Sequence, residues 1–308
     1  MFTDRARLRN ALLLSLLAAA LLIPFLEEPY FTKLAARVLI FAMVAVSLDL
    51  LVGYGGLVSL GHAAYFGLGC YIAGTLPLIG VHGAFAVLPA AAISGALFGM
   101  VTGALSLRAT GLYFIFITLA FAQMAYFVAG GIRPLGGLDG FALKMPTTLP
   151  GGFALNEPHV LVWFATALLI LTLWGAHRLV RSPFGMVLQA ARDNQGKLAA
   201  LGLPAYPARL AVYTASAGIA GVAGALYANL TEFISPASMS IVMSAEFLFM
   251  IILGGVATVF GPLIGALALV VLEQILSGLT VHWMFWLGLV LVVRVLFLRR
   301  GLYGFLQR

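Results

Sequence analysis

Long apolar runs, separated by short polar connections, extend along almost the whole chain. A helix needs about 17 to 25 mostly apolar residues to cross the hydrocarbon core of a bilayer. We therefore expect an all-α, polytopic membrane protein with about ten transmembrane helices, folded as a single domain over residues 1–308. The predicted spans cover residues 11–26, 34–52, 57–79, 84–106, 112–130, 159–177, 209–230, 241–259, 261–277 and 281–298.

One substantial polar stretch, residues 178–208, carries the start and stop signals of a helix. Ser182 can cap the N-terminus, Pro183 suits the first helical position, and Gly202 follows the last turn. The pattern predicts one amphipathic helix from residue 183 to 201, which offers its apolar stripe to a soluble partner. The stripe consists of residues near helical spacing, namely Phe184, Val187, Leu188, Ala191, Leu198 and Leu201.

Composition and charge orient these spans. The chain is 63% hydrophobic and only 9% charged, whereas soluble proteins contain roughly 25% charged residues. With both termini in the cytoplasm, ten crossings place twelve of the 17 basic residues inside and four outside. Basic residues concentrate in cytoplasmic loops, so segment 178–208 is expected inside and the Gly- and Pro-rich loop 131–158 outside. The net charge of +7 thus reflects membrane orientation and does not predict nucleic-acid binding.

The first apolar run resembles a signal peptide, because Arg5, Arg7 and Arg9 precede it. No small-residue cleavage site follows the run, so we expect it to be kept as the first span.

A glycine-rich segment, GYGGLVSLGHAAYFGLGCY at residues 53–71, is the most distinctive stretch inside the apolar runs. Each glycine costs a helix up to about 1 kcal/mol relative to alanine, so this segment is either a continuous span or a broken one. A broken segment exposes backbone groups to a polar solute, and Ser59, His62 and Tyr65 would share one face of it. The alternative is a hinge in which a neighbouring helix satisfies His62.

Two further polar residues complete the candidates for a solute pathway. Gln123 lies deep in its predicted span, where an amide needs hydrogen-bonding partners, so it either contacts solute or bonds another helix. Glu246 lies within about a turn and a half of a span end. No ionisable side chain is placed at the bilayer centre. We therefore expect the driving force to come from outside the chain, and no tight substrate site within it.

Five segments, in order along the chain, resemble the LivM-type permeases, the membrane subunits of branched-chain amino acid ABC importers. They read GYGGLVSLGHAAYFGLG, LRATGLYFIFITLAFAQM, RSPFGMVLQAARDN, AGVAGALYA and ILGGVATVFGPLIGA. The resemblance implies a multi-pass protein of the bacterial cytoplasmic (inner) membrane. Its implied partners are two P-loop ATPase subunits, a second homologous permease subunit and an extracytoplasmic solute-binding protein. The residues implied to couple transport to the ATPases are Arg181, Ser182, Pro183, Phe184, Gly185, Leu188, Arg192, Asp193, Leu201 and Gly202.

The absence of catalytic motifs agrees with this resemblance. The sequence contains no G-x-x-x-x-G-K-[ST] loop for ATP phosphates, and no G-x-S-x-G, H-E-x-x-H or Cys/His cluster. We expect no enzyme activity, catalytic residue, metal site or cofactor in this chain, with ATP bound by the partner subunits. After Asp193 the chain departs from the family pattern, with Ala199 where the family usually has an acidic residue. A permease for other amino acids, amides or urea, a self-sufficient secondary transporter, and a membrane enzyme or sensor are the alternatives.

Overall fold

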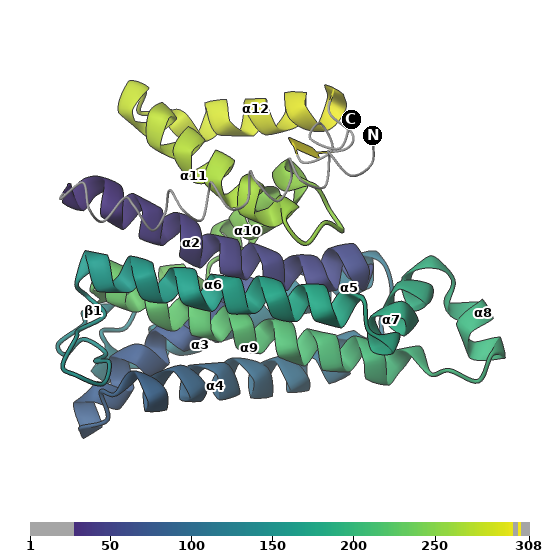
Figure 1. Ribbon diagram of the computed structural model, residues 1–308, viewed down its shortest axis with the longest axis horizontal. Helices are drawn as coiled ribbons and strands as arrows, with labels where there is room; N and C mark the ends of the chain where they lie inside the picture. Colours follow the sequence, from purple (N-terminus) through teal and green to yellow (C-terminus); the bar gives the residue numbers. More distant parts are fainter. Residues whose placement is uncertain (1–27, 298–300, 303–308) are drawn as a thin grey trace.

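A computed structural model of the protein describes residues 28–297 and 301–302, and shows a bundle of long helices (Figure 1). The α-helices are α2 (Pro29–Asp49), α3 (His62–Thr75), α4 (Ala84–Ser106), α5 (Leu112–Gly131), α6 (Pro158–Val180), α7 (Pro183–Asp193), α8 (Gln195–Ala200), α9 (Ala205–Thr231), α10 (Ile241–Gly254), α11 (Gly261–Leu279) and α12 (Trp283–Phe297). The shorter elements are η2 (Leu50–Tyr54), η3 (Leu76–Ile79), η4 (Arg133–Leu135), η5 (Pro236–Met239) and the paired antiparallel strands β1 (Phe141–Ala142) and β2 (Phe233–Ile234).

Seven helical segments in the described part of the chain are long and apolar enough to cross a membrane, and α10 and α12 are shorter apolar helices. The helical, polytopic fold is therefore confirmed. The predicted run 11–26 lies outside the described residues. The predicted span 241–259 is shorter than expected, since α10 ends at Gly254. There the glycines Gly254 and Gly255 lead into a non-helical turn before α11.

Helix α2 lies at the centre of the bundle, packed against α6, α9, α10 and α11. Its apolar residues cover every face, which is the pattern of a fully buried helix. Phe41 of α2 contacts the rings of Phe66, Tyr227 and Phe247. Around this core, α3, α4 and α9 approach one another closely through small residues. A Cβ atom on Gly95 would lie 2.5 Å from the carbonyl oxygen of Ala217 in α9.

The glycine-rich segment is broken. Helix α2 continues through the π-helical η2 to Tyr54, whereas residues 57–61 are not helical and α3 begins at His62. Neighbouring side chains bond the exposed backbone of this stretch: the Leu60 N–H donates to Thr118 Oγ1 and the Ala63 N–H to Ser244 Oγ. Irregular backbone is tolerated within a membrane when protein groups satisfy it in this way.

The segment 183–201 is not the single helix that the sequence predicted. Ser182 caps α7 as expected, accepting a hydrogen bond from the Gly185 N–H. However, α7 ends at Asp193, because Asn194 has an extended backbone and uses its side chain to cap α8 through the Lys197 N–H, at 2.9 Å. Figure 1 shows α7 and α8 at one end of the bundle and β1 at the opposite end. The two loops that were predicted on opposite sides of the membrane therefore lie at opposite ends of the fold.

Candidate functional site

Helix α7 is held against the bundle by the apolar stripe that was predicted to face a partner. Leu188 and Ala191 are buried and Phe184 is half-buried. Gln189 also holds α7 against α6, since its side-chain amide donates to the carbonyl oxygen of Val180 at 3.1 Å. Gly185 lies so close to the end of α6 that a Cβ atom there would lie 2.5 Å from the Val180 oxygen. The predicted stripe is therefore not free as a whole, because the chain's own packing buries Leu188, Ala191 and Leu198.

The surface that the α7–α8 loop leaves exposed overlaps with that stripe only at Leu201. Met186 is 59% exposed and Leu201 is 76% exposed. Met186 was not predicted as a contact residue, because it lies off the apolar stripe. Of the ten predicted coupling residues, six are exposed, namely Arg181, Pro183, Arg192, Asp193, Leu201 and Gly202. Ser182 and Phe184 are half-buried, and Gly185 and Leu188 are buried.

Arg192 connects α7 to the adjacent end of the central helix. Its Nη1 donates to the carbonyl oxygen of Gly53 in η2 at 2.6 Å, and its Nε donates to Asp193 at 3.0 Å. The aliphatic stem of Arg192 lies over Gly56, where a Cβ atom would be 2.5 Å from Arg192 Cγ. Gly56 also has a φ of +68°, which favours glycine. The loop and the η2 turn thus fit against each other closely.

The pathway candidates Ser59, His62 and Tyr65 are buried in the region where α3 packs against α4 and α9, and the rings of His62 and Tyr65 are in contact. Each is at most 1% exposed. Tyr65 Oη lies 2.8 Å from Thr102 Oγ1 and 2.7 Å from Tyr213 Oη, and the Ser59 hydroxyl accepts a hydrogen bond from the Gly61 N–H at 3.1 Å. These three residues were predicted to share a face, and the structure brings them together although Ser59 precedes the helix.

The bonds of His62 define its tautomer. His62 Nε2 lies 2.8 Å from Ser216 Oγ, and the Ser216 hydroxyl donates to the carbonyl oxygen of Ser47. Because a serine has one hydroxyl proton, the His62 Nε2 must carry the proton that it shares with Ser216. The other ring nitrogen, Nδ1, is a buried acceptor without a partner among the described residues. A neighbouring helix thus satisfies one side of the imidazole, as the hinge alternative expects.

Gln123 and Glu246 lie apart from Ser59, His62 and Tyr65. Gln123 is in α5, and its buried Nε2 has no partner among the described residues. Glu246 is half-buried in α10 and interacts electrostatically with Arg37 and Glu273. Arg37 Nη2 donates to both carboxylate oxygens of Glu273 at 3.0 Å.

Arg37 was counted among the basic residues on the outer side of the membrane, near the start of the predicted span 34–52. Helix α2 begins earlier, at Pro29, so Arg37 lies about 12 Å along it. Opposite charges on two different spans were the signal that could have revealed the Arg37–Glu273 ion pair.

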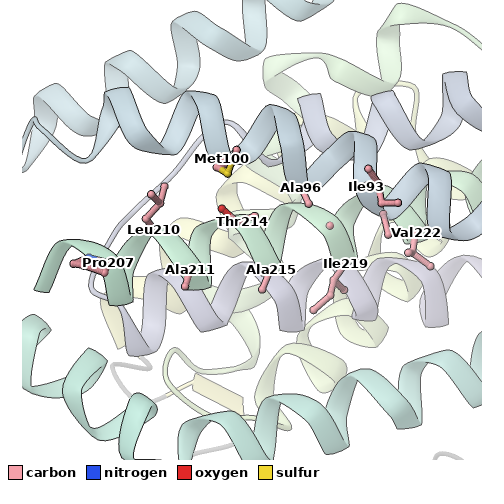
Figure 2. Close-up of a pocket in the computed structure, with 12 residues that line it drawn as sticks. Ile93, Ala96, Met100, Pro207, Leu210, Ala211, Thr214, Ala215, Ile219 and Val222 are labelled. Atoms are coloured by element: carbon pink, nitrogen blue, oxygen red, sulfur yellow. The ribbon is translucent and has the colours of Figure 1, made fainter.

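Figure 2 shows an apolar groove of about 750 Å³ between α4 and α9. Ile93 and Met100 project into it from α4, and Leu210, Thr214 and Ile219 from α9. A second cavity of about 410 Å³ lies between α3, α4, α5 and η5. Among the described residues, no charged side chain lines either cavity, and no group of three or more His, Cys, Asp or Glu could hold a metal ion.

The spans and the buried α2 define a multi-pass helical membrane protein. A model of the family "Branched-chain amino acid transport system / permease component" matches residues 30–298, and the chain belongs to this family.

Relatives of the chain carry matching names. The high-affinity branched-chain amino acid transport system permease proteins LivM of Escherichia coli (strain K12) and Salmonella typhimurium are each 28% identical to this chain over an aligned length of 313 residues. Each alignment covers 94% of this chain and 74% of the relative. The probable branched-chain amino acid transport permease protein LivM of Methanocaldococcus jannaschii is 24% identical over 77% of this chain and 79% of its own length. No solved structure matches the chain.

Proposed function

We propose that this chain is the membrane-spanning permease subunit of an ATP-driven importer for branched-chain or related hydrophobic amino acids in the bacterial cytoplasmic membrane. The family match over residues 30–298 carries this proposal, because it covers the described spans and the α7–α8 loop together. Separate P-loop ATPase subunits bind and hydrolyse ATP, so the chain needs no cofactor and no ATPase site of its own. A second homologous permease and an extracytoplasmic solute-binding protein complete the importer.

The α7–α8 loop is the proposed docking site for the ATPase subunits. Its inner face is anchored to the bundle through Leu188, so the docking surface consists of exposed residues, including Arg181, Met186, Asp193 and Leu201. Apolar side chains held in water on a short, well-anchored helix are typical of a helix that fits into a groove on another protein.

The test is transport in proteoliposomes that hold the chain with its co-encoded permease and ATPase subunits. We expect leucine uptake that requires both ATP on the side of the ATPase subunits and the solute-binding protein on the opposite side of the membrane. Uptake by the chain alone, driven by an ion gradient, would establish the secondary transporter instead. Preference for an amide or urea over leucine would keep the permease assignment and replace the substrate. Substituting Gln123 by leucine then tests the pathway, since a changed order of solute preference identifies a residue that contacts solute.

A further inference from the structure

A buried carboxylate lies where the central helix approaches the α7–α8 loop. Asp49, at the end of α2, is 1% exposed. Its Oδ1 accepts a hydrogen bond from the Ala257 N–H at 2.9 Å, and its Oδ2 accepts one from the Thr258 N–H at 3.2 Å. Both amides belong to the turn that joins α10 to α11, about 208 residues away along the chain. One side chain thus satisfies two backbone N–H groups of the turn, so Asp49 fixes the α10–α11 turn to α2.

Gly53, one turn after Asp49, leaves room for the α10–α11 turn to approach this side chain. Gly53 faces the α10–α11 turn, where a Cβ atom would overlap with Asp49 Oδ1 and lie 2.5 Å from the Ala257 nitrogen. Ala257 itself has a φ of +60°, a conformation that side-chain-bearing residues rarely adopt without support from their surroundings. Its bond to Asp49 supplies that support. The turn is therefore held in one position by a specific carboxylate and a specific glycine.

The opposite side of η2 is bonded to α7. Gly53 accepts the 2.6 Å hydrogen bond from Arg192 Nη1, and Arg192 also attracts the Asp49 carboxylate electrostatically. We call Asp49, Gly53, Arg192, Ala257 and Thr258 the η2 joint. Helix α7 packs against α6, α9 and η2, whereas α10 and α11 pack against α2. The joint is thus a direct polar connection between the α7–α8 loop and the α10–α11 pair.

We propose that the η2 joint transmits movement of α7 to α10 and α11, with Asp49 as the positioning residue at its centre. The inference rests on the proposed function, in which ATPase subunits move α7. A π-helical turn suits this role, because π-turns interrupt the regular backbone hydrogen bonding of an α-helix and are frequent at functional sites. When α7 shifts, Arg192 pulls η2 through its hydrogen bond to the Gly53 carbonyl. Asp49 then moves the α10–α11 turn through its hydrogen bonds to the backbone N–H groups of Ala257 and Thr258.

The experiment measures ATP hydrolysis and leucine uptake in the same proteoliposomes, with the complete importer carrying Asp49→Ala, Gly53→Ala or Arg192→Ala. For Asp49→Ala and Gly53→Ala we expect the ATPase subunits to co-purify in the wild-type ratio and hydrolysis to continue, while the leucine imported per ATP falls about tenfold or more, the usual scale of coupling between sites. Arg192 is an exposed residue of the docking loop, so Arg192→Ala is compared only in importers that have retained their ATPase subunits. Because Asp49 and Arg192 act in series in this proposal, the leucine imported per ATP should fall no further in the double variant than in either single variant.

Two controls isolate the joint from general destabilisation. Ser47→Ala removes a buried hydroxyl from α2 two residues from Asp49, where it bonds only its own helix through Val44 O among the described contacts. Arg178→Ala removes an exposed cation at the end of α6. Both controls should keep the wild-type leucine-to-ATP ratio.

Asp49→Asn guards against failure of the alanine variant to fold. It keeps the size of the side chain and the acceptor for Ala257, but it turns an N–H₂ group toward the Thr258 N–H, so we expect an intermediate ratio. Wild-type ratios in the assembled Asp49→Asn and Gly53→Ala importers would overturn the joint. If the wild-type chain fails to retain ATPase subunits, the proposed function is overturned instead. The outcome that overturns the joint is therefore distinguishable from the outcome that overturns the proposed function.

Discussion

The inward packing of α7 leads to a prediction that separates anchoring from partner binding. Leu188 is fully buried, whereas Met186, two residues earlier on the same helix, is 59% exposed. Replacing a buried leucine by alanine costs about 2–5 kcal/mol, while an exposed substitution usually changes stability by less than about 0.5 kcal/mol. Leu188→Ala should therefore loosen α7, and Met186→Ala should leave it in place.

Limited proteolysis of the α7–α8 loop in detergent measures this difference. When opening is fast relative to cleavage, the cleavage rate follows the population of the open loop, so a loss of 2 kcal/mol raises the rate about 30-fold. We expect at least that increase for Leu188→Ala and little change for Met186→Ala. In the same samples, Met186→Asp should weaken ATPase binding about tenfold without faster cleavage, a change of about 1.4 kcal/mol. Wild-type cleavage of Leu188→Ala would refute the inward packing of the stripe.

Three further predictions test the packing of the bundle. Gly224→Val should abolish the folded, monodisperse protein in detergent, because even a Cβ atom there overlaps with a backbone carbonyl of α3, whereas Gly175→Ala, with nothing within 4 Å, should behave as wild type. Asn194→Ala should lower the stability of α8 by about 1 kcal/mol, seen as faster hydrogen exchange confined to that helix, and unchanged exchange would contradict its role as a cap. Arg37→Ala should destabilise the protein by about 1–3 kcal/mol, because it leaves the partly buried Glu273 carboxylate without its charged hydrogen-bond donor. The added change Glu273→Ala should restore thermal stability in part, and a further loss would count against the ion pair.

The spans could be predicted from the sequence because the length of an apolar run is a local property. Residues 84–106, for example, were predicted as a span and form α4 with the same bounds. The break at Asn194 was not predicted, because the apolar spacing continues through it and only the side-chain cap reveals that α8 is a separate helix. Whether residues 57–61 are helical depends on distant groups such as Thr118, which no local pattern contains.

The candidate site was predictable to a smaller extent. The coupling residues are close in sequence, so they had to lie in one region of the fold. Which way their apolar stripe faces was not predictable, because an amphipathic helix buries the same residues whether it packs on its own bundle or on a partner. The partners of Asp49 and Arg37 are more than 200 residues away, and only tertiary structure brings them together.

The break at Asn194 divides the loop into two parts with different freedom to change. On α7, a substitution at the buried face loosens the helix from the bundle. On α8, all positions but Leu198 are exposed, and exposed substitutions rarely affect folding. Mutations can therefore accumulate on α8 at little structural cost, whereas the contacts of α7 with the bundle restrict the residues that its buried face can accept.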